Sequence, residues 1–131
     1  MILLDTHALV WLVTEPRKLS REATAAIRRA YDQGGVGIAS ITLWELAVLF
    51  ALGRLRDRGT VEASVRLIVE ESRVVVHELD PAIAALAAQM PEPVAKDPAD
   101  RMIVATAAIR AIPLVTKDER ILSSGLCRAI W

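Results

Sequence analysis

The hydrophobic residues of this chain follow two spacings. Short apolar runs with β-branched residues predict buried strands, and these runs lie at Met1–Leu4, Val36–Ala39, Val74–Val76 and Pro113–Thr116, with Cys127–Trp131 as a short edge strand. Between the runs, apolar positions recur at helical spacing, as in Ala23, Ala26, Ile27, Ala30 and Tyr31, and again in Ile83, Leu86, Ala87 and Met90. Apolar strands that alternate with helices are typical of a parallel sheet covered on both faces. We therefore expect an α/β fold, a three-layer α/β/α sandwich with a mostly parallel sheet of four to five strands.

Two of the predicted helices are apolar almost all round. For Met102–Ile109 we interpret this as a central position in the sandwich. For Leu43–Leu52, which we expect Ser40 to cap, two explanations stay open: simple burial, or an exposed apolar strip that binds a partner or a second copy. The prolines of Pro91–Pro98 predict a long loop. Since there is no internal repeat or linker, residues 1–131 are expected to form a single domain.

Composition narrows the class of protein. The 131 residues are 53% hydrophobic and 24% charged, which indicates a globular chain with a buried core. Its longest apolar runs are seven residues, far below the roughly 18 needed to cross a bilayer, so no membrane association is expected. Asp5 and His7 interrupt the apolar start and no basic leader precedes them, so a secretory signal is not indicated. The lone Cys127 excludes an internal disulfide, and together these features predict a cytoplasmic protein.

The charges balance, with 16 Lys and Arg against 16 Asp and Glu and a sequence pI of 6.7. A chain of zero formal net charge has no overall positive field to attract nucleic acid, so any contact with a polyanion must be local. Thirteen of the cations are arginine, whose planar fork suits two-point contacts with phosphate.

Four acidic residues are predicted to lie at one edge of the sheet. Asp5 closes the first strand, Glu45 lies in the first turns of the helix after the second, Asp100 begins the Met102 helix and Asp118 follows the fourth strand. Ligands of open parallel sheets bind beyond the carboxyl ends of the strands. Carboxylates gathered there repel one another unless a cation neutralises them, and Mg²⁺ prefers such oxygen ligands. A metal-bound water of lowered pKa is suited to phosphodiester cleavage.

Helix capping also explains several of these acids. Thr42 and Glu45 have the spacing of a capping box. Asp97 precedes a proline as an N-cap does, which places Asp100 in the first helical turn, and Asp118 precedes a short helix. Capping and metal binding are compatible, because one carboxylate oxygen can accept from the backbone while the other faces a ligand. Asp5 is harder to explain as a cap, because it ends a strand and more apolar residues follow it.

Four segments contain these acids in chain order: LLDTHALVW (residues 3–11), ASITLWELA (39–47), DPADRMIVATA (97–107) and LVTKDERI (114–121). Together they resemble the PIN-domain ribonucleases, specifically the VapC toxins of bacterial toxin–antitoxin pairs. The resemblance implies that Asp5, Glu45, Asp100 and Asp118 form the catalytic, metal-binding acids, with Asp97 as an accessory acid. It also implies a Mg²⁺- or Mn²⁺-dependent endoribonuclease that acts on RNA, forms a homodimer and is neutralised by a cognate antitoxin whose tail occupies the cleft.

Other polar and aromatic residues are candidates for supporting roles. Thr6 and Thr116 flank two of the acids and are predicted to orient a metal-bound water or a phosphate. Weaker candidates for contact with the substrate are Arg101, Lys117, Arg120 and His7. For Arg101 an ion pair with Asp97 is the alternative. Trp11 and Trp44 could stack on bases, although a tryptophan on an apolar helix more commonly packs in a core or an interface.

Two other classes of protein share parts of this pattern. A receiver-type phosphoacceptor module is also a small parallel α/β domain with strand-end acids and a lysine such as Lys117, but it has adjacent acids after the first strand, where this chain has Thr6 and His7. Such a module would be labelled by acetyl phosphate. A non-catalytic PIN-like binding domain, in which every acid is a helix cap, would show no change in melting temperature with Mg²⁺ or Mn²⁺.

Overall fold

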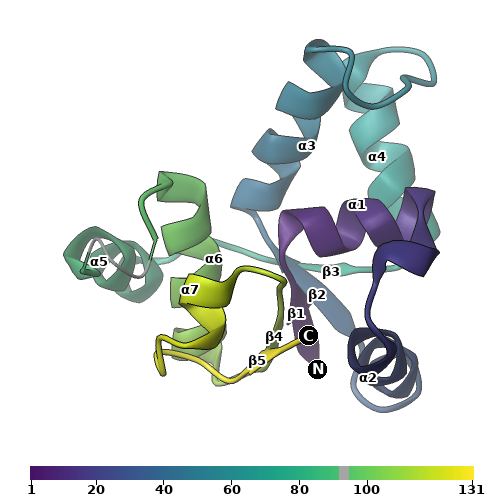
Figure 1. The fold of residues 1–131 in the computed structure, drawn as a ribbon. Helices are drawn as coiled ribbons and strands as arrows, with labels where there is room; N and C mark the ends of the chain where they lie inside the picture. The colour runs from purple at the N-terminus through teal and green to yellow at the C-terminus, as the bar shows by residue number, and fades with distance from the viewer. Residues whose placement is uncertain (92–94) are drawn as a thin grey trace.

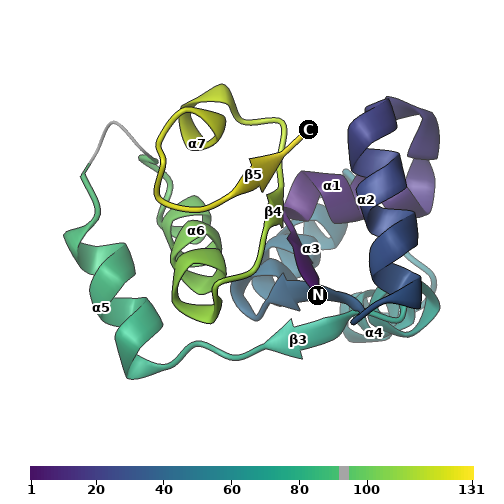
Figure 2. The ribbon, with the colours of Figure 1, turned by 90° about the horizontal axis from the view of Figure 1, so that it is seen from below.

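The central element is one parallel sheet. The computed structural model describes residues 1–91 and 95–131, and within them five strands pair in the order β3-β2-β1-β4-β5, every pair parallel (Figures 1 and 2). The strands are β1 (Ile2–Leu4), β2 (Val36–Ala39), β3 (Val75–His77), β4 (Leu114–Val115) and β5 (Ala129–Ile130). All five predicted strands are confirmed, and β5 lies at the predicted edge. Of the loop predicted at Pro91–Pro98, residues 92–94 lie outside the described residues, and residues 95–97 form neither helix nor strand.

Helices cover both faces of this sheet, which confirms the three-layer sandwich. They are α1 (Thr6–Thr14), α2 (Arg21–Asp32), α3 (Ile41–Ala51), α4 (Val61–Ser72), α5 (Pro81–Gln89), α6 (Pro98–Arg110) and α7 (Glu119–Leu122), with a short 3₁₀ helix, η1, at Pro16–Lys18. Helices α1, α2 and α4 lie on one side of the sheet and α5, α6 and α7 on the other (Figure 1). Helix α3 leaves the end of β2 and packs against both α4 and α6.

The alternation of side chains along β1 connects the two faces. Ile2 and Leu4 pack in the core beneath α1 and α2, whereas Leu3 packs beneath α5 and α6. All three side chains are buried, as expected of a central parallel strand. Because every strand runs in the same direction, the residues that follow them collect at one edge of the sheet.

Two helix starts test the capping predictions. Helix α3 begins two residues before the predicted Leu43, and Ser40 itself has a helical backbone with φ −58° and ψ −29°. Ser40 occupies the N-cap position as predicted, but its side chain makes no capping hydrogen bond, and its hydroxyl instead accepts from the Leu79 N–H at 3.2 Å. Helix α6 begins at Pro98, and the Asp97 carboxylate accepts from the Ala99 N–H at 2.7 Å, as predicted for an N-cap.

The two apolar helices differ in burial. Ile103 and Val104 of α6 are fully buried, which confirms the central position predicted for that helix. Helix α3 is apolar toward both the core and the solvent. Trp44 on this helix is 61% exposed, and Leu52, which directly follows the helix, is 63% exposed. Its exposed side is therefore the strip that the sequence left open. Within the described residues, no helix is both long and apolar enough to cross a membrane.

Candidate active site

The predicted acids come from four different connections at the carboxyl edge of the sheet. Asp5 follows β1 and is the N-cap of α1, and Glu45 lies one turn inside α3, which follows β2. Asp100 lies in the first turn of α6, and Asp118 follows β4 as the N-cap of α7. The parallel topology, not sequence proximity, brings these acids to the same edge.

Asp5 is the most enclosed of these acids, with 4% of its surface exposed. One oxygen, Oδ1, accepts from the Thr6 N–H at 2.7 Å, and the other, Oδ2, accepts from the Thr116 hydroxyl at 2.7 Å. His7 Nδ1 lies 3.5 Å from Oδ2. A buried carboxylate held by two donors keeps one orientation and still has lone pairs for a further ligand.

Glu45 is held by Thr6 and not by a capping box. Helix α3 begins at Ile41, so Thr42 lies inside the helix and its buried hydroxyl is 3.0 Å from the Thr6 hydroxyl. The Thr6 hydroxyl donates to Glu45 Oε1 at 2.5 Å. The capping interpretation of Glu45 is therefore wrong, and a chain of hydroxyls aims its carboxylate instead.

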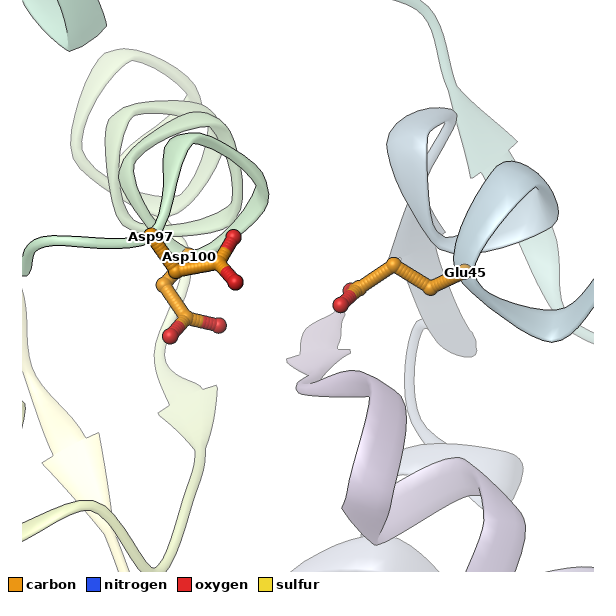
Figure 3. A group of neighbouring side chains, drawn as sticks. All are labelled: Glu45, Asp97 and Asp100. Atoms are coloured by element: carbon orange, nitrogen blue, oxygen red, sulfur yellow. The ribbon is translucent and has the colours of Figure 1, made fainter. Parts of the chain in front are cut away.

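The closest group of acids includes a residue that the sequence ranked as accessory. Carboxylate oxygens of Glu45, Asp97 and Asp100 lie within 4.8 Å of one another. In Figure 3 the two aspartates project from the start of α6 toward Glu45, which projects from α3 in the opposite direction. Opposite ligands of an ion with bonds of 2.0–2.1 Å are roughly 4 Å apart. A small shift of these side chains would therefore place all three around one hard cation, and an oxygen-only donor set is the one that Mg²⁺ and Mn²⁺ prefer.

The charge on this group raises the pKa values of two of its members. Burial, together with the charges of Asp5, Asp97, Glu45 and Asp118, raises the pKa of Asp100 to about 7. Burial also raises the pKa of Glu45, and the charges of Asp5 and Asp97 add to this, while the hydrogen bond from Thr6 opposes it. Like charges in a partly desolvated site favour a proton or a cation at that place. The negative charges at this site therefore favour the binding of a positive ion.

A cavity of about 260 Å³ opens over these residues. Its polar wall includes Asp5, Thr6, Glu45 and Asp100. The cavity is also lined by His7, Val10, Trp11 and Leu49 of α1 and α3. The acids therefore share this space with apolar and aromatic side chains.

Thr116 links Asp5 to the fourth predicted acid. Its buried hydroxyl donates to Asp5 and accepts from the Asp118 N–H at 3.1 Å. Asp118 caps α7 through the Arg120 N–H at 2.9 Å, as predicted, and its Oδ2 lies 3.7 Å from the Arg120 guanidinium. The hydroxyl protons of Thr116 and Thr6 are both donated to carboxylates. These threonines orient the acids, whereas the sequence assigned them to water or phosphate.

The four candidate substrate contacts have different surroundings. Arg101 donates to the carbonyls of Ala95, Met90 and Ala87 at 2.9, 3.0 and 3.4 Å. Its guanidinium therefore joins α6 to the end of α5, and these contacts are to carbonyls and not to Asp97. Arg120 is beside Asp118, as described above. His7 and Lys117 do lie beside the acids. His7 Nδ1 is 3.5 Å from Asp5 Oδ2, and His7 Nε2 accepts from the Lys117 N–H at 3.1 Å.

Sequence reasoning missed two features of this site. The buried hydroxyl of Thr42 supports Thr6, but its spacing from Glu45 suggested a cap. Trp131 packs against His7 and Trp11, with ring centroids 6.3 and 5.7 Å away. No local pattern signals a contact between residues at opposite ends of the chain.

The comparisons agree with this architecture. The family model of the PIN domain matches residues 2–124. The chain therefore belongs to the PIN-domain family, and the resemblance identified in the four sequence segments is confirmed. This membership leaves the receiver-type interpretation without support.

Particular relatives extend the comparison. The chain is 37% identical over 122 residues to Ribonuclease VapC22 of Mycobacterium tuberculosis, which covers 93% of this chain and 90% of that protein. Its fold is similar to a chain of VapBC2 from Rickettsia felis bound to a promoter DNA fragment, with a TM-score of 0.72, 14% identity and coverage of 98% and 97% of the two chains. It is also similar to a chain of VapBC-1 from nontypeable Haemophilus influenzae, with a TM-score of 0.68, 20% identity and coverage of 98% and 96%.

Proposed function

We propose that this protein is a divalent-metal-dependent endoribonuclease and the toxin of a type II toxin–antitoxin pair. The observation that carries the proposal is the group of carboxylates from β1, α3 and α6 around one cavity. Membership of the PIN family and 37% identity to a protein named as a ribonuclease support RNA as the substrate.

The metal would be Mg²⁺ or Mn²⁺, held by Glu45, Asp97 and Asp100, with Asp5 lining the same cavity. The oxygen-only donor set and the raised pKa of Asp100 favour a hard cation at this place. When bound, such an ion lowers the pKa of a coordinated water, which supplies the nucleophile for phosphodiester hydrolysis.

The protein's own contribution is orientation. Thr6 and Thr116 fix the carboxylates of Glu45 and Asp5, so these acids need little rearrangement to bind an ion. Asp118 is proposed as a catalytic acid at the rim, tied to Asp5 through Thr116. Asp97 joins the catalytic set as a full member, since its oxygen lies within the same 4.8 Å as those of Glu45 and Asp100.

The proposed partners are an antitoxin and a second copy of the chain in the cytoplasm. Structural neighbours include toxin–antitoxin complexes, among them one from Klebsiella pneumoniae with a TM-score of 0.66 and 20% identity. The exposed apolar side of α3, with Trp44 and Leu52, supports association with other protein.

Cleavage of single-stranded RNA by the purified protein tests the proposal. We expect cleavage with Mg²⁺ or Mn²⁺, none with EDTA, and a loss of at least about a hundredfold in Asp5→Asn and Asp100→Asn. The matched control is Asp32→Asn, which makes the same change at an exposed position at the end of α2. Cleavage that persists in EDTA, or that is equal in all three variants, would refute the proposal.

A further inference from the structure

A cluster of three rings lies beside the acids. His7 and Trp11, one turn apart on α1, have ring centroids 5.1 Å apart. Trp131, just after β5, completes the cluster against both of them. In Figure 2 the end of the chain after β5 points toward α1 and α2. His7 and Trp11 also line the cavity that contains Asp5, Glu45 and Asp100, so the rings and the acids share one space.

The ammonium groups of two lysines lie close to the Trp11 ring. Lys117 Nζ lies 5.7 Å and Lys18 Nζ 5.8 Å from its centroid. The two lysines come from the connection after β4 and from η1, so the fold and not the local sequence gathers them. Lys117 is placed by the hydrogen bond of its N–H to His7. Lys18 Nζ also lies 3.2 Å from Glu15 Oε1, so its charge is partly neutralised. In a chain of zero formal net charge, local cations such as Lys117 are what a polyanion would encounter here.

An aromatic ring with nearby cations is an arrangement that binds single-stranded nucleic acid. Both ammonium groups lie over the Trp11 ring, so they would move aside to the flanking phosphates when a base stacks there. Bases stack on the ring while the ammonium groups contact phosphates, and stacking tolerates any base because each has a π face. Bases within a duplex are already stacked and cannot reach such a ring, so the site selects unpaired segments.

We propose that Trp11 stacks on an unpaired base next to the phosphate that is cut, with Lys117 and Lys18 contacting the flanking phosphates. This inference rests on the proposed ribonuclease function and adds a base-binding subsite to it. His7 and Trp131 are positioning residues, which hold the Trp11 ring against the cavity.

Trp44 provides the internal comparison. Trp44 is more exposed than the rings of the cluster, but it does not line the cavity. Within the described residues, the lysine–aromatic contacts are made by Trp11. Loss of Trp44 therefore removes an equally large ring without removing the proposed stacking face.

The test uses a labelled single-stranded RNA that the wild type cuts at one site, and the same RNA with one abasic nucleotide placed in turn beside the cut. Trp11→Leu keeps apolar volume against the core but removes the ring, and Trp11→Phe retains a smaller ring. We expect Trp11→Leu to lower kcat/KM by roughly tenfold to a hundredfold and Trp11→Phe to lower it by less, while Trp44→Leu should keep the wild-type response to the abasic nucleotide. The abasic nucleotide should lower kcat/KM for the wild type but add no loss in Trp11→Leu.

A purely structural role for Trp11 gives a different result. Trp11→Leu would then lower the melting temperature, and the abasic nucleotide would cost the variant as much as it costs the wild type, which would overturn the inference. Lys117→Gln serves as a second variant with little effect on the core. It should weaken binding of all single-stranded sequences alike and reduce the salt dependence of binding by about one phosphate contact; an unchanged salt dependence would count against the subsite.

Binding separates failure of this inference from failure of the proposed function. The Asp5→Asn protein with Mg²⁺ is titrated with the same RNA, and quenching of tryptophan fluorescence is measured in a Trp44→Phe background. RNA cleavage without base-dependent quenching overturns the subsite and leaves the ribonuclease intact. Quenching that is lost in Trp11→Leu, combined with a wild type that cleaves no RNA, supports the subsite and overturns the ribonuclease.

Discussion

Replacing Asp100 with asparagine should stabilise the metal-free protein increasingly as the pH rises above about 4. The pKa of this carboxyl is raised from 3.8 to about 7 by burial and by four neighbouring acids. At low pH, below 3.8, the carboxyl is protonated in both the folded and the unfolded chain and has no effect on stability. Between the two pKa values the unfolded chain releases the proton and the folded protein retains it, so stability falls as the pH rises. Above about pH 7 the loss is complete.

The size of this effect follows from the difference between the two pKa values. A separation of about three pH units corresponds to about 4 kcal/mol. Asp100 is partly exposed, so solvent screening reduces this figure, and we expect roughly 2 kcal/mol. Asparagine has nearly the same shape as aspartate but no charge, so it removes the repulsion and leaves the packing intact.

Urea denaturation in EDTA, from about pH 4 to about pH 8, measures this difference. Asp100→Asn and the wild type should have similar free energies of unfolding near pH 4, and the variant should be more stable by roughly 2 kcal/mol near pH 8. Saturating Mn²⁺ near pH 8 should reverse the order, because a ligand at a hundred times its Kd stabilises a folded protein by about 2.7 kcal/mol and the amide is a poor ligand. The exposed Asp32→Asn change should show no pH-dependent difference. A constant difference between pH 4 and pH 8 would refute the assumption that the acids repel one another across a shared cavity.

Three further predictions concern the packing of one glycine, a buried hydrogen bond and the metal site. Gly37→Ala should destabilise the protein by about 1–3 kcal/mol in urea denaturation, because its Cβ would lie 2.6 Å from His77 Nε2, and adding His77→Ala should recover part of the loss; an unchanged midpoint in the single variant would contradict the packing. Thr116→Val should cost about 1–3 kcal/mol, since it removes a buried donor to Asp5 and the acceptor of a backbone N–H; equal stability would show that this hydrogen bond contributes little. Removing metal with EDTA should lower the melting temperature of the wild type but not of Asp5→Asn, and calorimetry with zero heat on adding Mn²⁺ would exclude a site at these acids.

The positions of the strands and their parallel direction were predictable from local pattern, but their order in the sheet was not predicted. Runs such as Val36–Ala39 are apolar and β-branched and lie between helices, so strand, helix and parallel sheet follow from periodicity. The rule that parallel strands end at one edge then predicts that Asp5, Glu45, Asp100 and Asp118 meet, and the observed cavity and charges agree with this.

Details of the site could not be predicted in the same way. Thr42 and Glu45 fit a capping box in sequence, but α3 begins at Ile41, and Thr6 from another helix holds the glutamate. Asp97 was ranked as a cap; it is one, but it also contributes an oxygen to the closest acidic group. Arg101, beside an acid in sequence, donates to carbonyls between two helices.

Sequence by itself therefore determined the strands, most of the helices and the edge of the sheet where the acids collect, because these depend on spacing along the chain and on a general rule of parallel topology. Helices α1 and α4 were not predicted from the spacing. Tertiary structure alone decided which oxygens are neighbours and which rings and lysines share their cavity, as with Trp11, Lys117 and Trp131. These contacts join residues more than a hundred positions apart. Their geometry depends on how helices pack on the sheet, to within an ångström or so, and no local pattern encodes that packing.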